Sequence, residues 1–221
     1  MQTYRSVVVG IDFSDASSRA LQLAYSLAKR CDAKQLALVH VIPSSRNKDG
    51  AQSDAEERLQ SLLDPSLKSQ CVVRFGSPAR ELSQYAHSVG ADLVVVGNRG
   101  HGALASIVMG SVARSLTQAV HCPVLVVGGE AELPEKFERV IAALDLSDIS
   151  KLVLEHAQAV AAASQGSVRI LSLCEAHADS EAETRKEIDH LLARSGGHGV
   201  PLDIDVHHHG SVSSGIVEAA K

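Results

Sequence analysis

The segment VVVGIDFSD, residues 7–15, decides the fold of this chain. Its apolar, β-branched first half is typical of a buried parallel strand, and Ser14 then supplies an N-cap for a following helix. The segment VIAALDLSD, residues 140–148, repeats the same order of apolar residues, aspartate, serine and aspartate. A repeat of this kind within 221 residues predicts two copies of one domain rather than a single larger domain.

The alternation of strand and helix continues outward from this segment through the first copy. Apolar residues at helical spacing follow the first strand, and β-branched runs then alternate with further amphipathic stretches. The predicted strands are residues 6–11, 35–41, 70–75, 92–96 and 123–127, and the predicted helices are residues 15–32, 55–63, 78–89 and 111–120. This order predicts an α/β fold with an open, doubly wound, parallel five-stranded sheet.

The second copy repeats this order but lacks its end. Strands are predicted at 139–145, 168–174 and 202–207, and helices at 149–163, 182–194 and from 214 onward. Equivalents of the fourth and fifth strands are absent from the sequence. We expect a first domain at residues 1–129 and an incomplete second domain at residues 137–221. Because the central strand would keep an unpaired edge, a shortened chain is favoured over a degenerate half-domain.

Bulk composition excludes several classes of protein. Aromatic residues make up 3% of the chain, so the core must be built from Val, Leu, Ile and Ala. The net charge is −5 and no basic block occurs, so we expect no nucleic-acid partner. No apolar run reaches the roughly 18 residues that a membrane span needs. Without a signal-peptide pattern, the expected location is the cytoplasm.

Disulfide frameworks and metal sites are not expected. The four cysteines, Cys31, Cys71, Cys122 and Cys174, are scattered without a C-x-x-C pair, which indicates reduced thiols that pack as small apolar side chains. The histidines at residues 207–209 end a predicted strand, where alternation sends the middle side chain to the opposite face from the other two. No metal-binding residue is therefore predicted.

A glycine-rich loop follows the fourth predicted strand. Gly97, Gly100 and the pair Gly110-Ser111 stand between a buried strand and a helix. The first two glycines would let the backbone approach a phosphate with positive φ, and Ser111 would cap a helix whose N-terminus attracts anions. The loop lacks the lysine of a P-loop, and the first β–α turn lacks G-x-G-x-x-G. Phosphate binding is the favoured interpretation, and a plain glycine turn with a capping serine is the alternative.

Asp12 stands at the carboxyl end of the first strand. Ligands of doubly wound sheets bind beyond this edge, at the point where the strand order reverses. An acidic side chain there could accept hydrogen bonds from a ribose hydroxyl or an adenine amine. Asp145 holds the same place in the second copy, so a capping or structural role stays open for both residues.

These features give the chain its resemblance to universal stress proteins of the tandem type. The spacing Gly97-x2-Gly100-x9-Gly110-Ser111 matches, without a gap, the G-x2-G-x9-G-[ST] pattern of the family's ATP-binding variety. The resemblance covers the first copy as far as HCPVLVV, residues 121–127, and the part of the second copy that is present. It implies the sheet order 3-2-1-4-5 of folds that resemble the adenine nucleotide alpha hydrolases.

The resemblance also implies an ATP site, with Mg²⁺, in the first copy. It places Asp12 near the adenosine and the Val41 backbone against the adenine. It places the following residues around the ribose and the phosphates: Gly97, Arg99, Gly100, Gly110, Ser111 and Val112. It further implies that the two copies pack about a pseudo-two-fold axis with residues 123–127 at or near the interface. It is also compatible with a homodimer.

The leading hypothesis is a cytoplasmic ATP-binding module for stress response or signalling, at most a slow ATPase. A nucleotide-independent scaffold would have no reason to keep every glycine of the loop. A small adenylating enzyme would need a positioned base or nucleophile near the phosphates, and the loop offers only Arg99, His101 and Ser111. No catalytic residue is therefore predicted, and both alternatives stay open.

Overall fold

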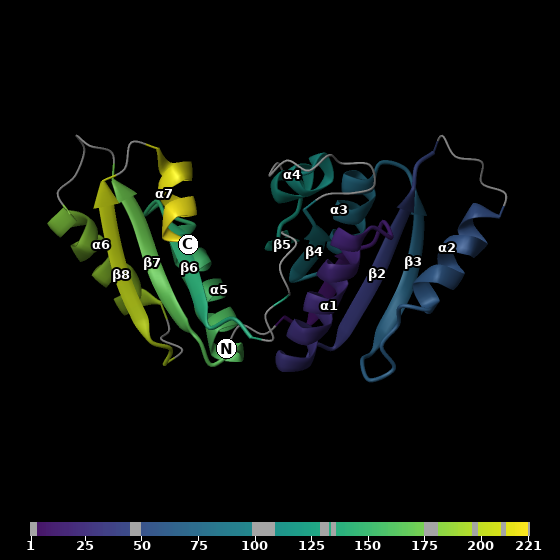
Figure 1. The fold of residues 1–221 in the computed structure, drawn as a ribbon, viewed down its shortest axis with the longest axis horizontal. Coiled ribbons are helices and arrows are strands. Elements are labelled where there is room, and N and C mark those ends of the chain that lie inside the picture. The colour runs from purple at the N-terminus through teal and green to yellow at the C-terminus, as the bar shows by residue number, and fades with distance from the viewer. Residues whose placement is uncertain are drawn as a thin grey trace. The chain divides into compact units, whose positions relative to one another are not determined.

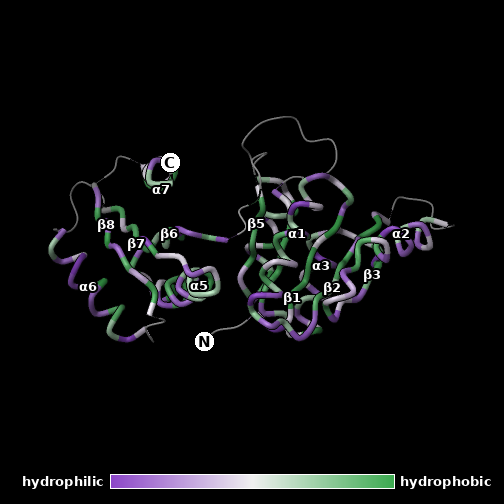
Figure 2. The backbone as a smooth tube through the Cα atoms, turned by 60° about the horizontal axis from the view of Figure 1, so that its bottom comes forward, coloured by the Kyte–Doolittle hydropathy of each residue, from purple (hydrophilic) through white to green (hydrophobic). Residues whose placement is uncertain are grey.

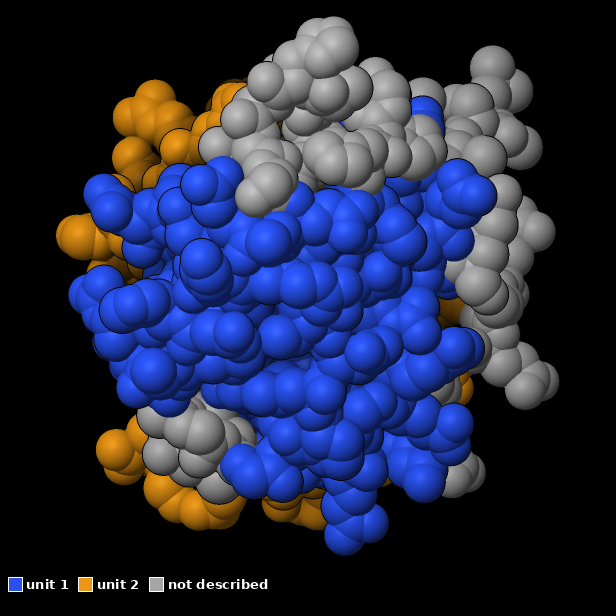
Figure 3. Space-filling view, turned by 90° about the vertical axis from the view of Figure 1, so that its left-hand side faces the viewer, with its two compact units in different colours: residues 1–2, 134–221 blue, residues 3–133 orange. Residues whose placement is uncertain are grey.

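The chain divides into two compact units, residues 3–133 and residues 134–221 (orange and blue in Figure 3). The computed structural model describes residues 4–44, 50–98, 109–128, 133, 136–174, 181–195, 199–208 and 211–220. Each unit contains one parallel sheet with helices packed on it (Figure 1). The expected domain limits at residues 129 and 137, and the expected packing of the two copies, stay predictions.

The first unit alternates strands and helices as its sequence predicts (Figure 1). Its strands are β1 (Ser6–Gly10), β2 (Gln35–Ile42), β3 (Ser69–Phe75), β4 (Leu93–Gly97) and β5 (Val124–Val127). Its helices are α1 (Asp15–Arg30), α2 (Ala51–Gln60), α3 (Pro78–Ser88) and α4 (Ser111–Ala119). All five strands are parallel and lie in the order β3-β2-β1-β4-β5, so the expected sheet order is confirmed.

Helices bury both faces of this sheet. On one face, Val8 of β1 and Val94 of β4 pack with Leu82 of α3 and Leu116 of α4 in a single buried cluster. Helices α1 and α2 contact the sheet outside that cluster. Figure 2 shows the strands of the sheet as largely green, hydrophobic segments. Because all strands run in parallel between two helical layers, their carboxyl ends meet at one edge, where the connecting loops can form a site.

Helix α1 begins at the predicted cap. The Ser14 hydroxyl oxygen accepts a hydrogen bond from the Ser17 N–H at 3.2 Å, as an N-cap residue does. The helix ends at Arg30, short of the predicted end at Asp32, because Asp32 takes a left-handed φ of 51° that no helix contains. None of the helices in the described ranges is long and apolar enough to cross a membrane.

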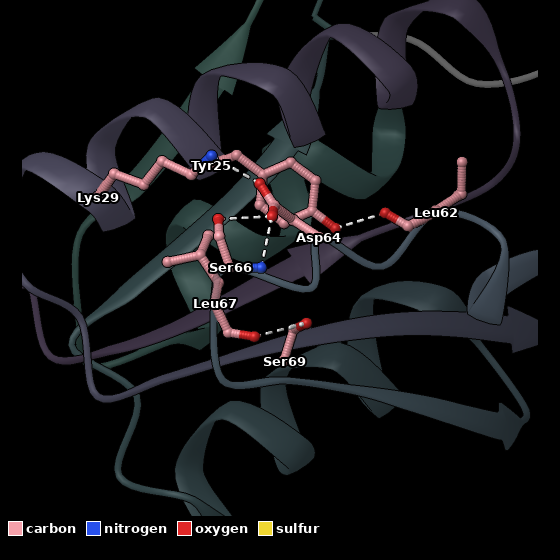
Figure 4. A network of polar contacts seen from close by, with 7 residues as sticks. All are labelled: Tyr25, Lys29, Leu62, Asp64, Ser66, Leu67 and Ser69. Carbon is pink, nitrogen blue, oxygen red and sulfur yellow. Dashed lines mark hydrogen bonds and ion pairs between the residues drawn. The ribbon is translucent and has the colours of Figure 1, made fainter.

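A polar network ties α1 to the segment between α2 and β3 (Figure 4). The Tyr25 hydroxyl donates to the Leu62 carbonyl at 2.6 Å, and Lys29 Nζ lies 2.7 Å from the Asp64 carboxylate. The same carboxylate accepts hydrogen bonds from the Ser66 N–H at 2.8 Å and the Ser66 hydroxyl at 2.6 Å. The bond from Lys29, followed by those from Ser66, lowers the pKa of Asp64 from 3.8 to about 2.

The substitution Asp64→Asn is expected to make the first unit less sensitive to acid. Because the pKa of Asp64 is lower in the folded state, its interactions stabilise the fold above pH 3.8 and are lost as the pH falls toward about 2. The urea midpoint should therefore drop more for the wild type than for Asp64→Asn between about pH 5 and about pH 2.5. Asp54→Asn, at an exposed position in α2, serves as the control. An equal drop in wild type and Asp64→Asn would contradict this account.

The second unit contains a three-stranded parallel sheet. Its strands are β6 (Arg139–Leu144), β7 (Ser167–Cys174) and β8 (Leu202–His208), and its helices are α5 (Ser150–Ala163), α6 (Glu181–Arg194) and α7 (Val212–Ala219). The order β6-β7-β8 corresponds to that of β1-β2-β3. Leu154 of α5, Ile170 of β7 and Ile188 of α6 are each 0% exposed and form its core.

Two uncommon backbone conformations recur at matching places in the two units. Phe13 after β1 has φ 63°, and Leu146 after β6 has φ 59°. Asp32 after α1 has φ 51°, and Gln165 after α5 has φ 54°. Non-glycine residues rarely adopt positive φ, and these four are all that the described part of the chain contains. The repeated sequence segments therefore fold alike, turn conformations included.

Three of the four cysteines are free thiols in the structure: Cys31, Cys71 and Cys122. Burial raises the pKa of each of these thiols, and the nearby Asp92 carboxylate adds to the effect at Cys122. Because the thiolate is the reactive form, these side chains act as small apolar groups near neutral pH.

Candidate functional site

The predicted site residues within the described ranges lie at the carboxyl edge of the five-stranded sheet. Asp12 follows β1, Val41 lies near the end of β2, and Gly97 ends β4. Strand β1 pairs with both β2 and β4, and the strand order reverses between β1 and β4. This reversal is the switch point beside which doubly wound sheets bind ligands. Arg99 and Gly100 lie outside the described residues.

The start of α4 is held against the end of β4. The Gly110 N–H donates to the Asn98 carbonyl at 2.7 Å, and the Asn98 N–H donates to the Val127 carbonyl of β5 at 2.8 Å. Ser111 and Val112 form the first turn of α4, where N–H groups have no acceptor within the helix. Since this turn contains no acidic residue, the helix N-terminus keeps its positive partial charge.

Two expectations about the glycine-rich loop are wrong in detail. Gly110 rather than Ser111 is the N-cap of α4, because Gly110 has the extended backbone of a cap, with φ −62° and ψ 157°. Positive φ was expected at Gly97, but Gly97 is not among the described glycines with positive φ. Neither Gly97 nor Gly110 therefore requires the conformational freedom of glycine.

Close packing against α1 explains why residue 97 is glycine. A Cβ atom on Gly97 would lie 2.8 Å from the carbonyl carbon, 2.9 Å from the Cβ and 3.0 Å from the oxygen of Ala16. Ala16 lies in the first turn of α1, so the end of β4 touches the backbone of that helix. The fold alone accounts for this glycine of the motif, and evidence for a phosphate site must come from Gly110 and its neighbours.

Asp12 is fixed by the turn that it begins. Its Oδ1 accepts hydrogen bonds from the Ser14 N–H at 3.0 Å and from the Ser14 hydroxyl at 2.5 Å. Ser14 itself caps α1, so the carboxylate and the helix start form one unit. The structural role that sequence analysis left open is thus observed. A ligand at this edge would meet a carboxylate whose orientation is already set.

The second unit reproduces the same turn. Asp145 Oδ1 accepts hydrogen bonds from the Ser147 N–H at 3.0 Å, the Ser147 hydroxyl at 2.6 Å and the Ser150 hydroxyl at 3.0 Å. These bonds, those of Ser147 first, lower the pKa of Asp145. The turn is therefore a structural feature that both units share.

The main chain of Val41 faces the β1 side of β2. The Ile11 N–H donates to the Val39 carbonyl at 2.9 Å, and the Gly76 N–H donates to the Ile42 carbonyl at 3.0 Å. Peptide groups alternate along a strand, so Val41 points the same way as Val39. The β1–β2 ladder ends at the pairing of Gly10 with Val39, and Val41 lies beyond it on the side where Asp12 follows β1.

Sequence analysis missed three residues next to Asp12. The Phe13 ring lies 4.7 Å from the His40 ring between centroids, and Arg58 Cζ lies 3.7 Å from the Phe13 centroid. His40 Nδ1 is also 2.8 Å from the Ile11 carbonyl oxygen. The sequence offered one signal for these contacts, the bulky Phe13 directly after Asp12. The structure shows that this residue takes a positive φ of 63°.

The histidine run at the end of β8 does not gather metal ligands in the described ranges. His207 Nε2 lies 2.6 Å from Asp205 Oδ1. Among the residues that the structure describes, no three of His, Cys, Asp and Glu come together so as to hold a metal ion. His209 lies outside these residues.

Comparison with known proteins identifies relatives of the first unit. The model of the universal stress protein family matches residues 3–128 of the 221. The chain is also 30% identical over 164 residues to a universal stress protein from Staphylococcus aureus (strain USA300). That alignment covers 67% of this chain and 98% of the relative.

Two solved structures extend the likeness in fold to both units. A universal stress protein from Archaeoglobus fulgidus DSM 4304 matches with a TM-score of 0.73 and 17% identity, covering 99% of this chain and 83% of that one. One from Pseudomonas aeruginosa UCBPP-PA14 matches with a TM-score of 0.67 and 17% identity, covering 98% and 78%. At such identity the likeness concerns the fold alone. On the family match and the Staphylococcus aureus relative, the chain belongs to the universal stress protein family.

Proposed function

We propose that the first unit binds ATP, with Mg²⁺, at the carboxyl edge of its sheet. In this proposal the protein serves as a cytoplasmic module for stress response or signalling and hydrolyses ATP slowly at most. One juxtaposition carries the proposal: the hydrogen bond from Gly110 to Asn98 anchors the start of α4 at the end of β4, across the switch point from Asp12. An open helix N-terminus and a fixed carboxylate suit the two ends of a nucleotide.

The proposed roles follow from the groups that each residue presents. The N–H groups of Ser111 and Val112 would donate to phosphate oxygens, which helix N-termini bind well. The Asp12 carboxylate would accept a hydrogen bond from the ribose or the adenine amine, and the Val41 peptide would meet the adenine edge. Mg²⁺ would be held mainly by phosphate oxygens and water, its usual ligands at nucleotide sites.

The loop residues outside the described ranges belong to the same proposal. Arg99 and Gly100 would line the phosphates, because they complete the glycine motif between β4 and α4. Gly97 would contribute by its position at the end of β4, since its lack of a side chain is already required by Ala16.

We also propose that the two units are copies of one domain. The matched left-handed residues and the matched strand orders β3-β2-β1 and β8-β7-β6 support this proposal. The first copy carries the loop and the helix that would hold phosphates, so we expect its nucleotide at the start of α4.

Asp12→Ala is expected to weaken ATP binding about three- to tenfold, which corresponds to the net contribution of one typical hydrogen bond, roughly 0.5–1.5 kcal/mol. It should also narrow the preference for ATP over GTP, because the carboxylate would distinguish the adenine amine. Calorimetric titration with each nucleotide measures both quantities. Asp145→Ala removes the equivalent carboxylate from the second unit and should leave the ATP affinity unchanged. Asp12→Asn removes the charge of residue 12 but keeps an oxygen that can accept hydrogen bonds from Ser14. Equal affinities for Asp12→Ala and the wild type would refute the role of Asp12.

A further inference from the structure

Phe13 holds an unfavourable backbone conformation directly after Asp12. Its φ of 63° lies in the left-handed region, which a bulky residue occupies only when its surroundings hold it there. Leu146 has the equivalent φ of 59° in the second unit. The turn therefore forms without an aromatic ring, and the ring at residue 13 must serve something other than turn formation.

The Phe13 ring contacts two side chains from different elements. The His40 ring of β2 lies 4.7 Å away between centroids, at an interplanar angle of 44°. The Arg58 guanidinium carbon of α2 lies 3.7 Å from the ring centroid, well within the range of a cation–π interaction. We refer to Phe13, His40 and Arg58 as the Phe13 stack.

His40 connects this stack to both neighbours of Asp12. Its Nδ1 is 2.8 Å from the carbonyl oxygen of Ile11, the residue before Asp12, and its ring contacts Phe13, the residue after it. The backbone on either side of the aspartate is thereby tied to β2. Ser14 fixes the carboxylate separately through two hydrogen bonds, so backbone and carboxylate are restrained by different groups.

The second unit has the turn but not the stack. The ladders pair Ser6 with Gln35 in the first unit and Arg139 with Ser167 in the second, which places Ser172 at the position of His40. Neither Ser172 nor Leu146 carries a ring. The stack thus occurs in the unit that also has the loop after β4.

We propose that the Phe13 stack is a positioning element of the nucleotide site. It restricts the Asp12 turn so that the carboxylate meets the adenosine in one orientation, and it thereby sharpens the preference for adenine over guanine nucleotides. This inference rests on the proposed ATP site. The three residues of the stack position Asp12 through the backbone and need not touch the ligand.

The test compares Phe13→Leu, which installs the residue of the second unit, with Arg58→Gln, which removes the cation from an exposed position. Calorimetry with Mg-ATP and Mg-GTP should show ATP affinity reduced about three- to tenfold in both variants, with a smaller ATP-to-GTP ratio. Arg58→Lys keeps a cation over the ring and should restore most of the affinity. Arg30→Gln removes the same charge from the far end of α1 and should change neither value.

Hydrogen exchange of the Ser14 amide in the free protein separates positioning from direct contact. This amide donates to Asp12, so it should exchange faster in Phe13→Leu than in the wild type and be unchanged in Arg30→Gln. Weakened binding with unchanged exchange would overturn the positioning role. Wild-type affinity and preference in both stack variants would overturn the inference while leaving the ATP site intact. Absence of ATP binding by the wild type would contradict both the ATP site and the positioning role of the Phe13 stack.

Discussion

Substitution of Gly110 by valine is expected to weaken Mg-ATP binding by well over tenfold, which is more than about 1.4 kcal/mol. The backbone at Gly110, with φ −62° and ψ 157°, is accessible to valine, so the fold should tolerate the change. The added isopropyl group would stand beside the N–H groups of Ser111 and Val112 and keep phosphate oxygens at a distance. The loss would therefore arise from bulk and not from backbone strain.

A size series makes the Gly110 experiment decisive. Gly110→Ala adds a single methyl group, so its affinity for ATP, measured by calorimetry, should lie between those of the wild type and Gly110→Val. The thermal midpoints of the three ligand-free proteins should agree closely, because the backbone conformation suits all three residues. If Gly110→Val binds ATP as the wild type does, the phosphates are not held at the start of α4.

Gly97→Ala is expected to destabilise the first unit by roughly 2–3 kcal/mol through overpacking. The new methyl group would lie 2.8 Å from the backbone carbon of Ala16, which cannot move aside as a side-chain end can. The end of β4 and the first turn of α1 would have to separate. Urea denaturation followed by circular dichroism measures the lost free energy of unfolding.

Gly10→Ala is the matched control for this substitution. A Cβ on Gly10 would meet only side-chain atoms, Val96 Cγ1 at 3.0 Å and Leu82 Cδ1 at 3.1 Å, which can adjust at a cost of roughly 1 kcal/mol. Combining Gly97→Ala with Ala16→Gly should restore little stability, because the backbone contact remains. A Gly97→Ala protein as stable as Gly10→Ala would show that β4 and α1 are not closely packed there.

Much of the architecture could be predicted because it depends on local pattern. The β-branched runs and helical stretches of the first unit alternate clearly, and most strand limits differ from prediction by one residue. Resemblance to a known family then supplied the strand order, which local pattern does not contain. The helix at residues 78–88 begins with proline at its first position, as predicted, because proline is favoured there.

The site was predicted less completely, because its details depend on contacts between distant residues. Residue 97 is glycine because it packs closely against Ala16 of α1, a contact between distant residues. The motif alone suggested a positive φ at Gly97, which the structure does not contain. Ser111 was expected at the cap because serine favours that position, yet Gly110 already had the extended backbone. The contact of Arg58 with Phe13 joins α2 to the turn after β1, and no sequence motif marks it.

Calorimetric titration of the wild-type chain with Mg-ATP tests the central claim most directly. We predict a saturable heat of binding and a thermal midpoint that rises as ATP is added. No heat and no thermal stabilisation at millimolar ATP would contradict the account and leave the glycine motif with a structural role only.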